Sequence, residues 1–367
     1  MIETWDAREH EALPLHTVRA GATKAKLESA DEPVVHKLDA GPMQIDANIG
    51  TEAKLTCILY EKPIDGAGQL AAIIRNAAKA VDLRLVLPRE IVAVGEHPLV
   101  FVDAAYTVKG EPTKGGIFKV VAFPHPTTPA VCMHDELGYH ETFKRIVMGF
   151  ASSLSHPEAP KPSRFAELQV EKQDGHATGF SHMEVTDDTD GARVYQSISA
   201  TFTLRSPTEL DGVDAVRSER WERDGSISIV TYVEGEGGDI SENMTLRHTT
   251  GAEYTYEGTH LGKKISGKFK TQAPGGFLTD ERVATAVKRL AEGAELHVDV
   301  YHPNVDPTAP LDEIIHRVPH AERRFTVDFG KLHMTTTCDA EGRMDSASLA
   351  LGTTTMTFER AFIRGAY

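Results

Sequence analysis

The chain has 367 residues, which is enough for two ordinary domains, because a single hydrophobic core stops growing well before that length. Its apolar fraction of 40% and charged fraction of 25% are close to the average for globular proteins and are typical of neither a disordered nor a membrane-embedded class. The formal charge of −15 disfavours nucleic acid as a partner, since affinity for phosphate backbones comes mainly from Lys and Arg.

The N-terminus has neither the basic start nor the apolar run of a secretory signal, and no apolar stretch approaches the ~18 residues of a membrane span. The three cysteines, Cys57, Cys132 and Cys338, are odd in number and far apart, which favours reduced thiols over a disulfide framework. We therefore expect a cytoplasmic protein without a membrane span, in which each cysteine is a buried, inert thiol.

The first domain, residues 1–154, is predicted to be an antiparallel sheet packed with two helices. Apolar residues recur with three- and four-residue spacing over 68–81 and 139–154, which predicts two amphipathic helices. Glycine and proline, among them Pro88, separate β-branched and apolar runs as they do in consecutive strands. The predicted strands are 33–38, 43–49, 54–60, 83–87, 91–94, 99–108, 116–123 and 130–133.

A linker is predicted at residues 155–163, where three prolines in nine positions each fix φ and lack an amide proton. The second domain, 164–367, is predicted to be a mostly antiparallel β-meander, because Asp-Gly turn pairs separate strand-like runs. One helix is expected at 280–292, with Thr279 as its N-cap and Gly293 just past its end. The fold class is therefore α+β. The predicted strands are 165–171, 179–185, 193–204, 215–222, 226–233, 243–248, 253–256, 264–270, 295–301, 323–329, 331–338, 346–351 and 353–361.

The segment from Lys54 to Leu154 resembles the PsbP/DcrB-like α/β family. It shares the order strand, helix, several strands, and then a late strand leading to a closing helix, here Ala130-Val-Cys-Met-His-Asp-Glu-Leu-Gly-Tyr-His-Glu-Thr-Phe-Lys-Arg-Ile. The resemblance implies a mostly non-enzymatic protein. It also implies a link to secretion, because the family includes cytosolic chaperones that hold membrane-inserting segments of type VI secretion effectors.

The segment from Arg164 onward resembles the all-β domain found beside bacterial transglutaminase-like modules and in lipoprotein-like proteins. The matching residues are Gly179-Phe-Ser-His-Met183, Phe277-Leu-Thr-Asp at the helix start, Asp339-Ala-Glu-Gly342 and Phe358-Glu-Arg360. This resemblance implies a curved antiparallel sheet and no particular activity.

Cys132, His134 and His140 form the richest cluster of reactive side chains. Thiolate and imidazole are zinc ligands, and Cys132 and His134 would point to the same face of a strand. Cys132 with a histidine base such as His134 is also a candidate catalytic pair. Against the metal site, the compact ligand spacings of known zinc sites are absent. Against the catalytic pair, the apolar neighbours Ala130 and Val131 favour a buried thiol. The alternative places Cys132 in the core and both histidines on the surface, with no metal and no cofactor.

The sequence favours a non-enzymatic binding, chaperone or adaptor protein of the bacterial cytoplasm. Its partner would be a protein or a lipid-like ligand, bound in the groove between the N-terminal sheet and the Tyr139 helix or on the concave face of the C-terminal sheet. Two alternatives stay open. One is a metal- or thiol-dependent hydrolase built around Cys132, His134 and His140, and the other is a structural subunit of a larger assembly.

Overall fold

The computed structural model describes residues 9–39, 41–157, 162–236 and 239–367, and the chain divides into two compact units. Unit 1 comprises Met1–Pro162 together with Ala200–Val213, and unit 2 comprises Ser163–Ser199 together with Asp214–Tyr367. The first division falls inside the predicted linker 155–163, of which residues 158–161 lie outside the described chain. The grouping of residues 200–213 with the first unit was not predicted.

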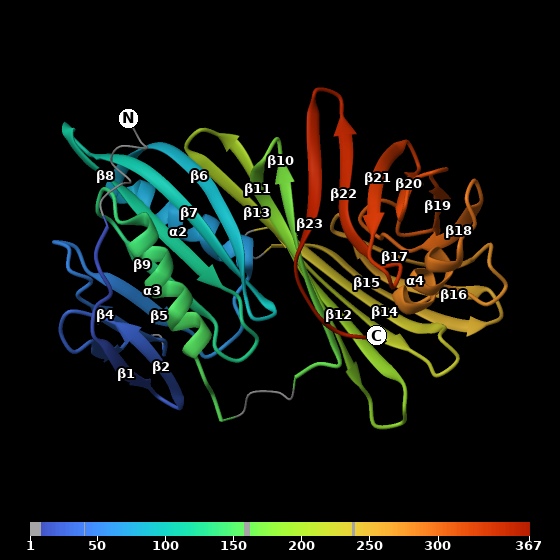
Figure 1. Cartoon of the computed structure of the whole chain (residues 1–367), viewed down its shortest axis with the longest axis horizontal. Coiled ribbons are helices and arrows are strands. Elements are labelled where there is room, and N and C mark those ends of the chain that lie inside the picture. The colour runs from blue at the N-terminus through green and yellow to red at the C-terminus, as the bar shows by residue number, and fades with distance from the viewer. Residues whose placement is uncertain (1–8, 40, 158–161, 237–238) are drawn as a thin grey trace. The chain divides into compact units, whose positions relative to one another are not determined.

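Within the described residues, unit 1 is built on a seven-stranded sheet with the order β3-β4-β5-β9-β8-β7-β6 (Figure 1). All of its neighbouring strands are antiparallel. β9 inserts between β5 and β8, which places Cys132 directly opposite Cys57. The strands are β3 (Val34–Lys37), β4 (Met43–Ala47), β5 (Leu55–Leu59), β6 (Val81–Val94), β7 (His97–Val108), β8 (Glu111–Phe123) and β9 (Ala130–His134).

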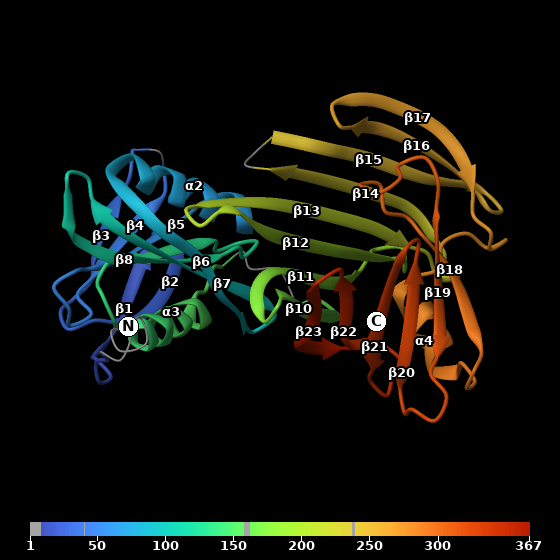
Figure 2. The same cartoon turned by 90° about the horizontal axis from the view of Figure 1, so that it is seen from above.

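Helices and a β-hairpin cover the two faces of this sheet. α2 (Gly66–Ala80) contacts β6, β7 and β8. α3 (His140–Ser153) contacts β6 and β9 but packs most extensively on β2 (Thr23–Glu28), which pairs with β1 (Leu15–Ala20) in a separate two-stranded sheet. Figure 2 shows α2 and α3 on opposite sides of the seven-stranded sheet.

The apolar runs of the central strands follow from this two-sided cover. Phe101 and Val121 join Phe143 and Phe150 of α3 in one buried cluster. Because successive strand residues point to opposite faces, Val100 and its alternate neighbours are directed to the other side, where they are also buried. A strand buried on both faces has no polar alternation, which is why these runs are continuously apolar.

Unit 2 is formed, among the described residues, by a 14-stranded sheet made of two runs of consecutive hairpins, except that residues 200–213 of this sheet are grouped with unit 1. The runs meet where β23 pairs antiparallel with β10, so that Phe165 lies opposite Gly365. The first run is β10 (Phe165–Gln173), β11 (His176–Asp187), β12 (Arg193–Ser206), β13 (Glu209–Trp221), β14 (Ile227–Glu236), β15 (Asp239–Thr250), β16 (Glu253–His260) and β17 (Lys263–Lys270). The second run is β18 (Glu295–Val300), β19 (Leu311–Arg317), β20 (Arg324–Phe329), β21 (Leu332–Cys338), β22 (Met344–Leu351) and β23 (Thr354–Gly365).

α4 (Asp280–Arg289) joins the two runs and packs on β18. Its start is the predicted one, because Thr279 Oγ1 caps the helix by accepting a hydrogen bond from the Arg282 amide at 3.4 Å. Its last residue is Arg289 rather than residue 292 of the prediction. Figure 2 shows the two ends of the sheet bending round toward the same side. The buried cluster between them is largely aromatic and includes Trp221, Tyr254 and Tyr301.

Four strands differ from the sequence-based expectation. β6 runs through Pro88, where the sequence predicted a break; β6 is the edge strand of its sheet and its register shifts beside this proline, so the missing amide proton is tolerated. β1 and β2 were not predicted, because only two residues of each strand are buried. β19 was not predicted either, because its polar residues obscure the apolar alternation.

The coarse prediction of a mixed, β-rich and mostly antiparallel fold is confirmed. In the part of the chain that the structure describes, no helix combines the length and the apolar character needed to cross a bilayer.

Candidate functional site

Cys132 is not the free thiol that the sequence predicted. It lies on β9 opposite Cys57 of β5, and the two residues form a disulfide. The prediction of separate reduced thiols was wrong for this pair because β9 returns to the sheet beside β5, 75 residues away in sequence. A sulfur held in a disulfide is neither a nucleophile nor a thiolate ligand. Disulfides are also rare in reducing compartments, so this bond weighs against the predicted cytoplasmic location.

His134 and His140 are both buried, each with 1% of its surface exposed, so the alternative that placed them on the surface was wrong. His134 Nδ1 lies 3.4 Å from the Lys54 carbonyl oxygen, and burial lowers the pKa of its ring. His140 Nε2 lies 3.2 Å from Glu90 Oε1, and Lys144 Nζ donates to the other Glu90 oxygen at 2.5 Å. Burial alone would raise the pKa of Glu90, but the hydrogen bonds and the electrostatic attraction of His140 and Lys144 together outweigh it and lower the pKa to about 2.

The three predicted site residues therefore do not converge on one site. Phe143 of α3 lies between the sheet and the helix, with its ring centre 6.3 Å from that of His134 and 6.1 Å from that of Phe101. Side chains of the same apolar cluster fill the predicted groove between the sheet and the Tyr139 helix. Among the described residues, no three His, Cys, Asp or Glu side chains form a group that could hold a metal ion.

Unit 2 holds a cavity of about 500 Å³ that the sequence did not identify residue by residue. It is lined by β12, β13 and β14 from the first run of strands, by β18 and β19 from the second run, and by the start of α4. These strands are far apart in the order of the sheet, so the curvature of the sheet brings them around one space. The cavity therefore lies on the face where the sequence predicted a concave binding surface.

Aromatic side chains form much of the cavity wall. They are Tyr195, Tyr232, Phe277 and Tyr301. The Tyr301 hydroxyl donates to the Pro307 carbonyl at 3.1 Å, and the Tyr195 ring stacks on Trp221 with centres 5.2 Å apart. These contacts fix the rings in place, so the wall is formed before any ligand enters.

Arg217 and Glu219, both on β13, are bonded to each other at the cavity wall. Arg217 Nε donates to Glu219 Oε1 at 2.6 Å, and Arg217 Nη1 donates to the Tyr301 carbonyl at 2.5 Å. The second oxygen of Glu219 accepts a hydrogen bond from the indole of Trp221 at 2.7 Å. Both oxygens of this carboxylate and the charge of the guanidinium are therefore satisfied within the protein.

Asp280 and Glu313 differ from this pair. Within the described chain, neither carboxyl group has a hydrogen-bond or ion-pair partner, although both line the cavity. Burial raises the pKa of Asp280 to about 7, and the negative charge of Glu219 contributes to the shift. Burial also raises the pKa of Glu313. Two acidic side chains are thus directed at a space that offers them no partner.

The remaining polar groups of the wall are either neutral or already bonded. Burial and the nearby Arg217 lower the pKa of His302 to about 4, so its ring is uncharged at neutral pH. Asp299 Oδ2 accepts hydrogen bonds from the backbone amides of Gln272 and Ala273 at 2.7 and 2.9 Å. Asp280 and Glu313 are therefore the groups left to recognise a ligand.

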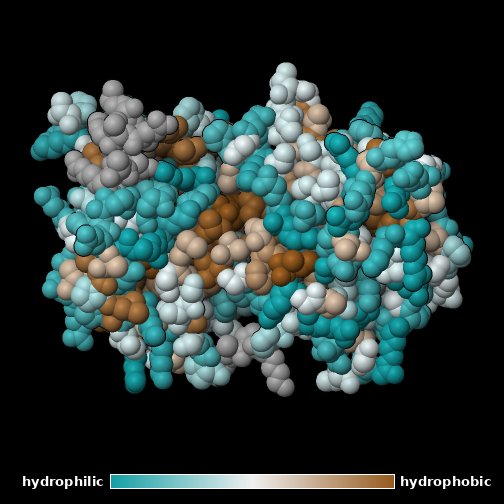
Figure 3. Space-filling view, in the orientation of Figure 1, coloured by the Kyte–Doolittle hydropathy of each residue, from teal (hydrophilic) through white to brown (hydrophobic). Residues whose placement is uncertain are grey.

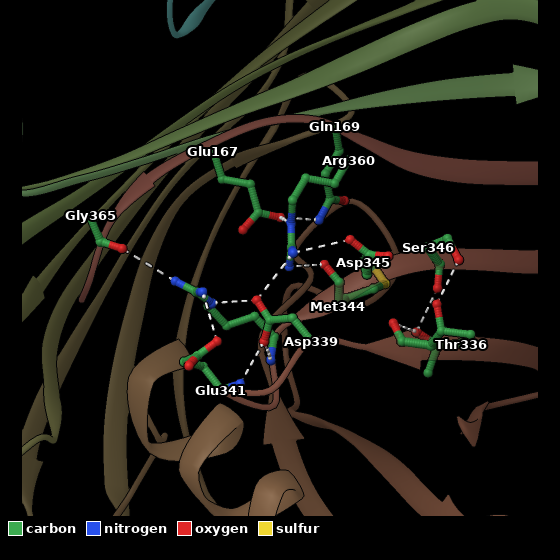
Figure 4. Close-up of polar contacts among 12 residues, drawn as sticks. Glu167, Gln169, Thr336, Asp339, Glu341, Met344, Asp345, Ser346, Arg360 and Gly365 are labelled. Atoms are coloured by element: carbon green, nitrogen blue, oxygen red, sulfur yellow. Dashed lines mark hydrogen bonds and ion pairs between the residues drawn. The ribbon is translucent and has the colours of Figure 1, made fainter. Parts of the chain in front are cut away.

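A second charged cluster of unit 2 surrounds Arg360 on β23 (Figure 4). Arg360 Nη1 lies 3.1 Å from Asp339 and 3.2 Å from Asp345, and its Nε lies 3.5 Å from Glu167. Arg343 Nε donates to Asp339 Oδ2 at 2.8 Å, the same oxygen that Arg360 contacts. The structure thus joins two of the segments on which the second family resemblance was based. Because every charge in it has a partner, this cluster holds the fold together rather than awaiting a ligand.

A pattern in the sequence could have pointed to the cavity. Alternate residues of β13 share one face of the strand, and they are Ala215, Arg217, Glu219 and Trp221. A face that holds Ala and Trp is expected to be buried, and Arg and Glu are rarely buried unless they are paired. The position of Asp280 carried no such signal, because an acidic residue in the first turn of a helix has an ordinary role there.

The exterior offers fewer signs of a docking face. The face seen in Figure 3 is mostly hydrophilic, with apolar side chains gathered in smaller areas. The large apolar side chains that are exposed in the described residues come from different strands and turns: Leu15, Val34, Leu85, Leu204, Val216, Ile240, Leu261, Val305, Leu332 and Leu351. No single element presents them together, so the cavity is the stronger candidate site.

No protein-family model matches the chain, and no curated protein matches it. Among solved structures, the chain is similar to the crystal structure of a DUF1089 family protein from Pseudomonas aeruginosa, with 12% sequence identity and a TM-score of 0.31. The match covers 46% of this chain and 88% of that one. So low a score supports no conclusion about fold or function, and the two family resemblances stay predictions.

Proposed function

We propose that the protein is a non-enzymatic binding protein that takes up a small, partly apolar or lipid-like molecule in the cavity of unit 2. The observation that carries this proposal is the cavity itself, whose volume of about 500 Å³ lies within the range typical of ligand sites. Its aromatic wall and its few unbonded polar groups are the combination that such sites use for affinity and orientation.

The same geometry favours binding over the predicted hydrolase. The disulfide removes Cys132 as a nucleophile, and His140 is bonded to Glu90. A second candidate function rests on Asp280, because a carboxyl group with a pKa of about 7 is suited to act as a general acid or base. Turnover of a ligand by the wild-type protein, lost in Asp280→Asn, would distinguish catalysis from binding.

The finer fold assignment belongs to the same proposal. We propose a scaffold with an N-terminal antiparallel sheet and two helices, followed by a β-meander unit with one helix, and the contacts of α2 with β6–β8 and of α3 with β6 and β9 support it. The PsbP/DcrB-like and transglutaminase-associated resemblances, the chaperone and secretion roles, the structural-subunit alternative and the cytoplasmic location stay predictions.

Filling the cavity tests the proposal. Ala215 lines the cavity from β13 with little exposure, so Ala215→Phe places a phenyl ring in the space a ligand would occupy. The matched control is Ala291→Phe, at an exposed position outside the lining. Protein purified from its native lysate is denatured, and the released small molecules are identified by mass spectrometry.

We expect wild type and Ala291→Phe to release the same molecule at a stoichiometry approaching one, and Ala215→Phe to release none. Equal release from all three proteins would place the ligand elsewhere. Release from none of them would contradict a binding function.

A further inference from the structure

Acidic groups outnumber basic groups in the cavity wall. Four carboxyl groups and one guanidinium line the space, the carboxyl groups belonging to Glu219, Asp280, Asp299 and Glu313. Arg217 neutralises Glu219, and backbone amides satisfy Asp299. Asp280 and Glu313 remain, on α4 and β19 respectively, without a donor among the described residues.

An enclosed carboxyl group without a hydrogen-bond donor is unusual, because burying it unbonded costs free energy. The two groups are near enough for the charge of Glu313 to affect the ionisation of Asp280. A single ligand group placed between them would supply both carboxyl groups with a hydrogen-bond donor. That group has to donate hydrogen bonds and is favoured by a positive charge.

We infer that the ligand of the unit 2 cavity carries an organic cation, an amine or a guanidinium, which Asp280 and Glu313 hold while the aromatic wall contacts its apolar part. This inference rests on the proposed function and names the chemical class of its ligand. Tyr195, Tyr232 and Tyr301 add to the selection, because the faces of aromatic rings attract cations.

Other ligand classes fit less well. A metal ion needs more ligands than the cavity offers, since no group of three suitable side chains occurs among the described residues. An anionic ligand would meet two further negative charges, and Arg217 is already bonded to Glu219 and to the Tyr301 carbonyl. A neutral alcohol could donate a hydrogen bond, but it would leave the negative charges uncompensated.

Binding of a cation should depend on pH, because Asp280 changes its charge near neutrality. The groups that face it are spread over β10, β12, β13, β19 and the C-terminal residue, and they are Glu167, Tyr195, Arg217, Glu219, Glu313 and Tyr367. Only Arg217 among them is positive, and it is bonded to Glu219. Affinity for the cation should therefore rise as the pH increases from 6 to 8.

Three probes that share one apolar body test the inference. They are 4-phenylbutylamine, 4-phenylbutan-1-ol and 4-phenylbutanoate, titrated calorimetrically into the full-length protein at pH 8. The test variant is Asp280→Asn with Glu313→Gln. The matched control is Glu322→Gln, a highly exposed acid outside the cavity. Circular dichroism checks that each variant is folded.

We expect the amine to bind at least about 10-fold more tightly than the alcohol and the carboxylate, a factor equivalent to 1.4 kcal/mol. The double variant should lose this preference and the control should keep it. If the double variant does not fold, the wild-type protein still decides: amine affinity should fall several-fold from pH 8 to pH 6, while alcohol affinity stays constant.

Two results would overturn the inference, and they differ in what else they affect. Equal affinity for the three probes would reject the cation while leaving a binding cavity in place. No binding of any probe, together with no molecule released in the mass-spectrometric experiment, would reject both the cation and the proposed function.

Discussion

The predicted site of unit 1 and the cavity of unit 2 both place titratable side chains inside the protein, but they differ in what those side chains are bonded to. Cys132 is bonded to Cys57, and His140 lies beside Glu90 in a packed interior. Asp280 and Glu313 line an open space and have no such partner among the described residues. The difference teaches that a cluster of reactive residue types marks a site only when the fold leaves room beside it.

The Arg360 cluster is, like the predicted site of unit 1, bonded within the protein. Its disruption should have the largest effect on stability. Arg360 is 7% exposed and faces Glu167, which is 2% exposed. Removing one partner of a buried ion pair leaves the other charge uncompensated, so Arg360→Ala should lower the free energy of unfolding by about 3–5 kcal/mol. Chemical denaturation of the variant and the wild type measures this loss. A loss below about 1 kcal/mol would mean that the cluster is not bonded as described.

The disulfide of unit 1 should have the next largest effect. It closes a long loop, with a sequence separation of 75, so Cys57→Ala with Cys132→Ala should cost about 2–4 kcal/mol of unfolding free energy. Denaturant titration measures that cost.

A thiol assay checks the bond directly. Burial raises the pKa of Cys338 to about 11, so this thiol should react only after denaturation. Denatured protein without reductant should therefore show one thiol, and three after reduction. Three thiols before reduction would show that Cys57 and Cys132 are not joined.

Asp280→Asn should raise the free energy of unfolding, whereas the preceding variants should lower it. The folded-state pKa of Asp280 is about 7, above its ordinary value of 3.8, so its contribution to stability is greatest at low pH and is lost as the pH rises through 7. Asparagine has no charge to bury. We expect the variant to gain about 1 kcal/mol relative to wild type between pH 6 and pH 8, since one pKa unit corresponds to 1.36 kcal/mol.

Urea denaturation of both proteins at the two pH values measures this gain. A difference between variant and wild type that does not change with pH would show that Asp280 ionises at its ordinary pKa.

The smallest effect is expected at an exposed ion pair. Arg323 and Glu322 are 3.5 Å apart with side chains 51% and 84% exposed, where solvent weakens the attraction. Arg323→Ala should change the unfolding free energy by less than about 0.5 kcal/mol. A loss comparable to that of Arg360→Ala in the same denaturation experiment would mean that burial does not separate the two classes of pair.

The sequence predicted the local elements well because their signals are periodic. The apolar residues of α3, among them Phe143 and Phe150, recur with helical spacing, and Thr279 marks the start of α4. Pairing between distant strands leaves no such signal. Neither the insertion of β9 beside β5 nor the joining of β10 to β23 could be deduced from either strand alone.

For the candidate site, the sequence predicted only a surface, the concave face of the C-terminal sheet, and not its residues. The second resemblance implied a curved sheet with a concave surface, and the cavity lies on that side of unit 2. Its residues were not identified, because Arg217 and Glu219 read as ordinary strand charges until Tyr301 and Trp221 are placed beside them. Charge and spacing can be taken from a sequence, but enclosure depends on the whole fold.

The carboxyl ¹³C resonance of Asp280, followed against pH with and without 4-phenylbutylamine, tests the central claim most directly, with Asp280→Asn to assign the signal. We predict a midpoint near pH 7 for the free protein, and a lower midpoint with the amine, because a bound cation favours the ionised carboxylate. A midpoint near the ordinary 3.8 that the amine does not change would contradict the account of an unpartnered acid at a binding cavity.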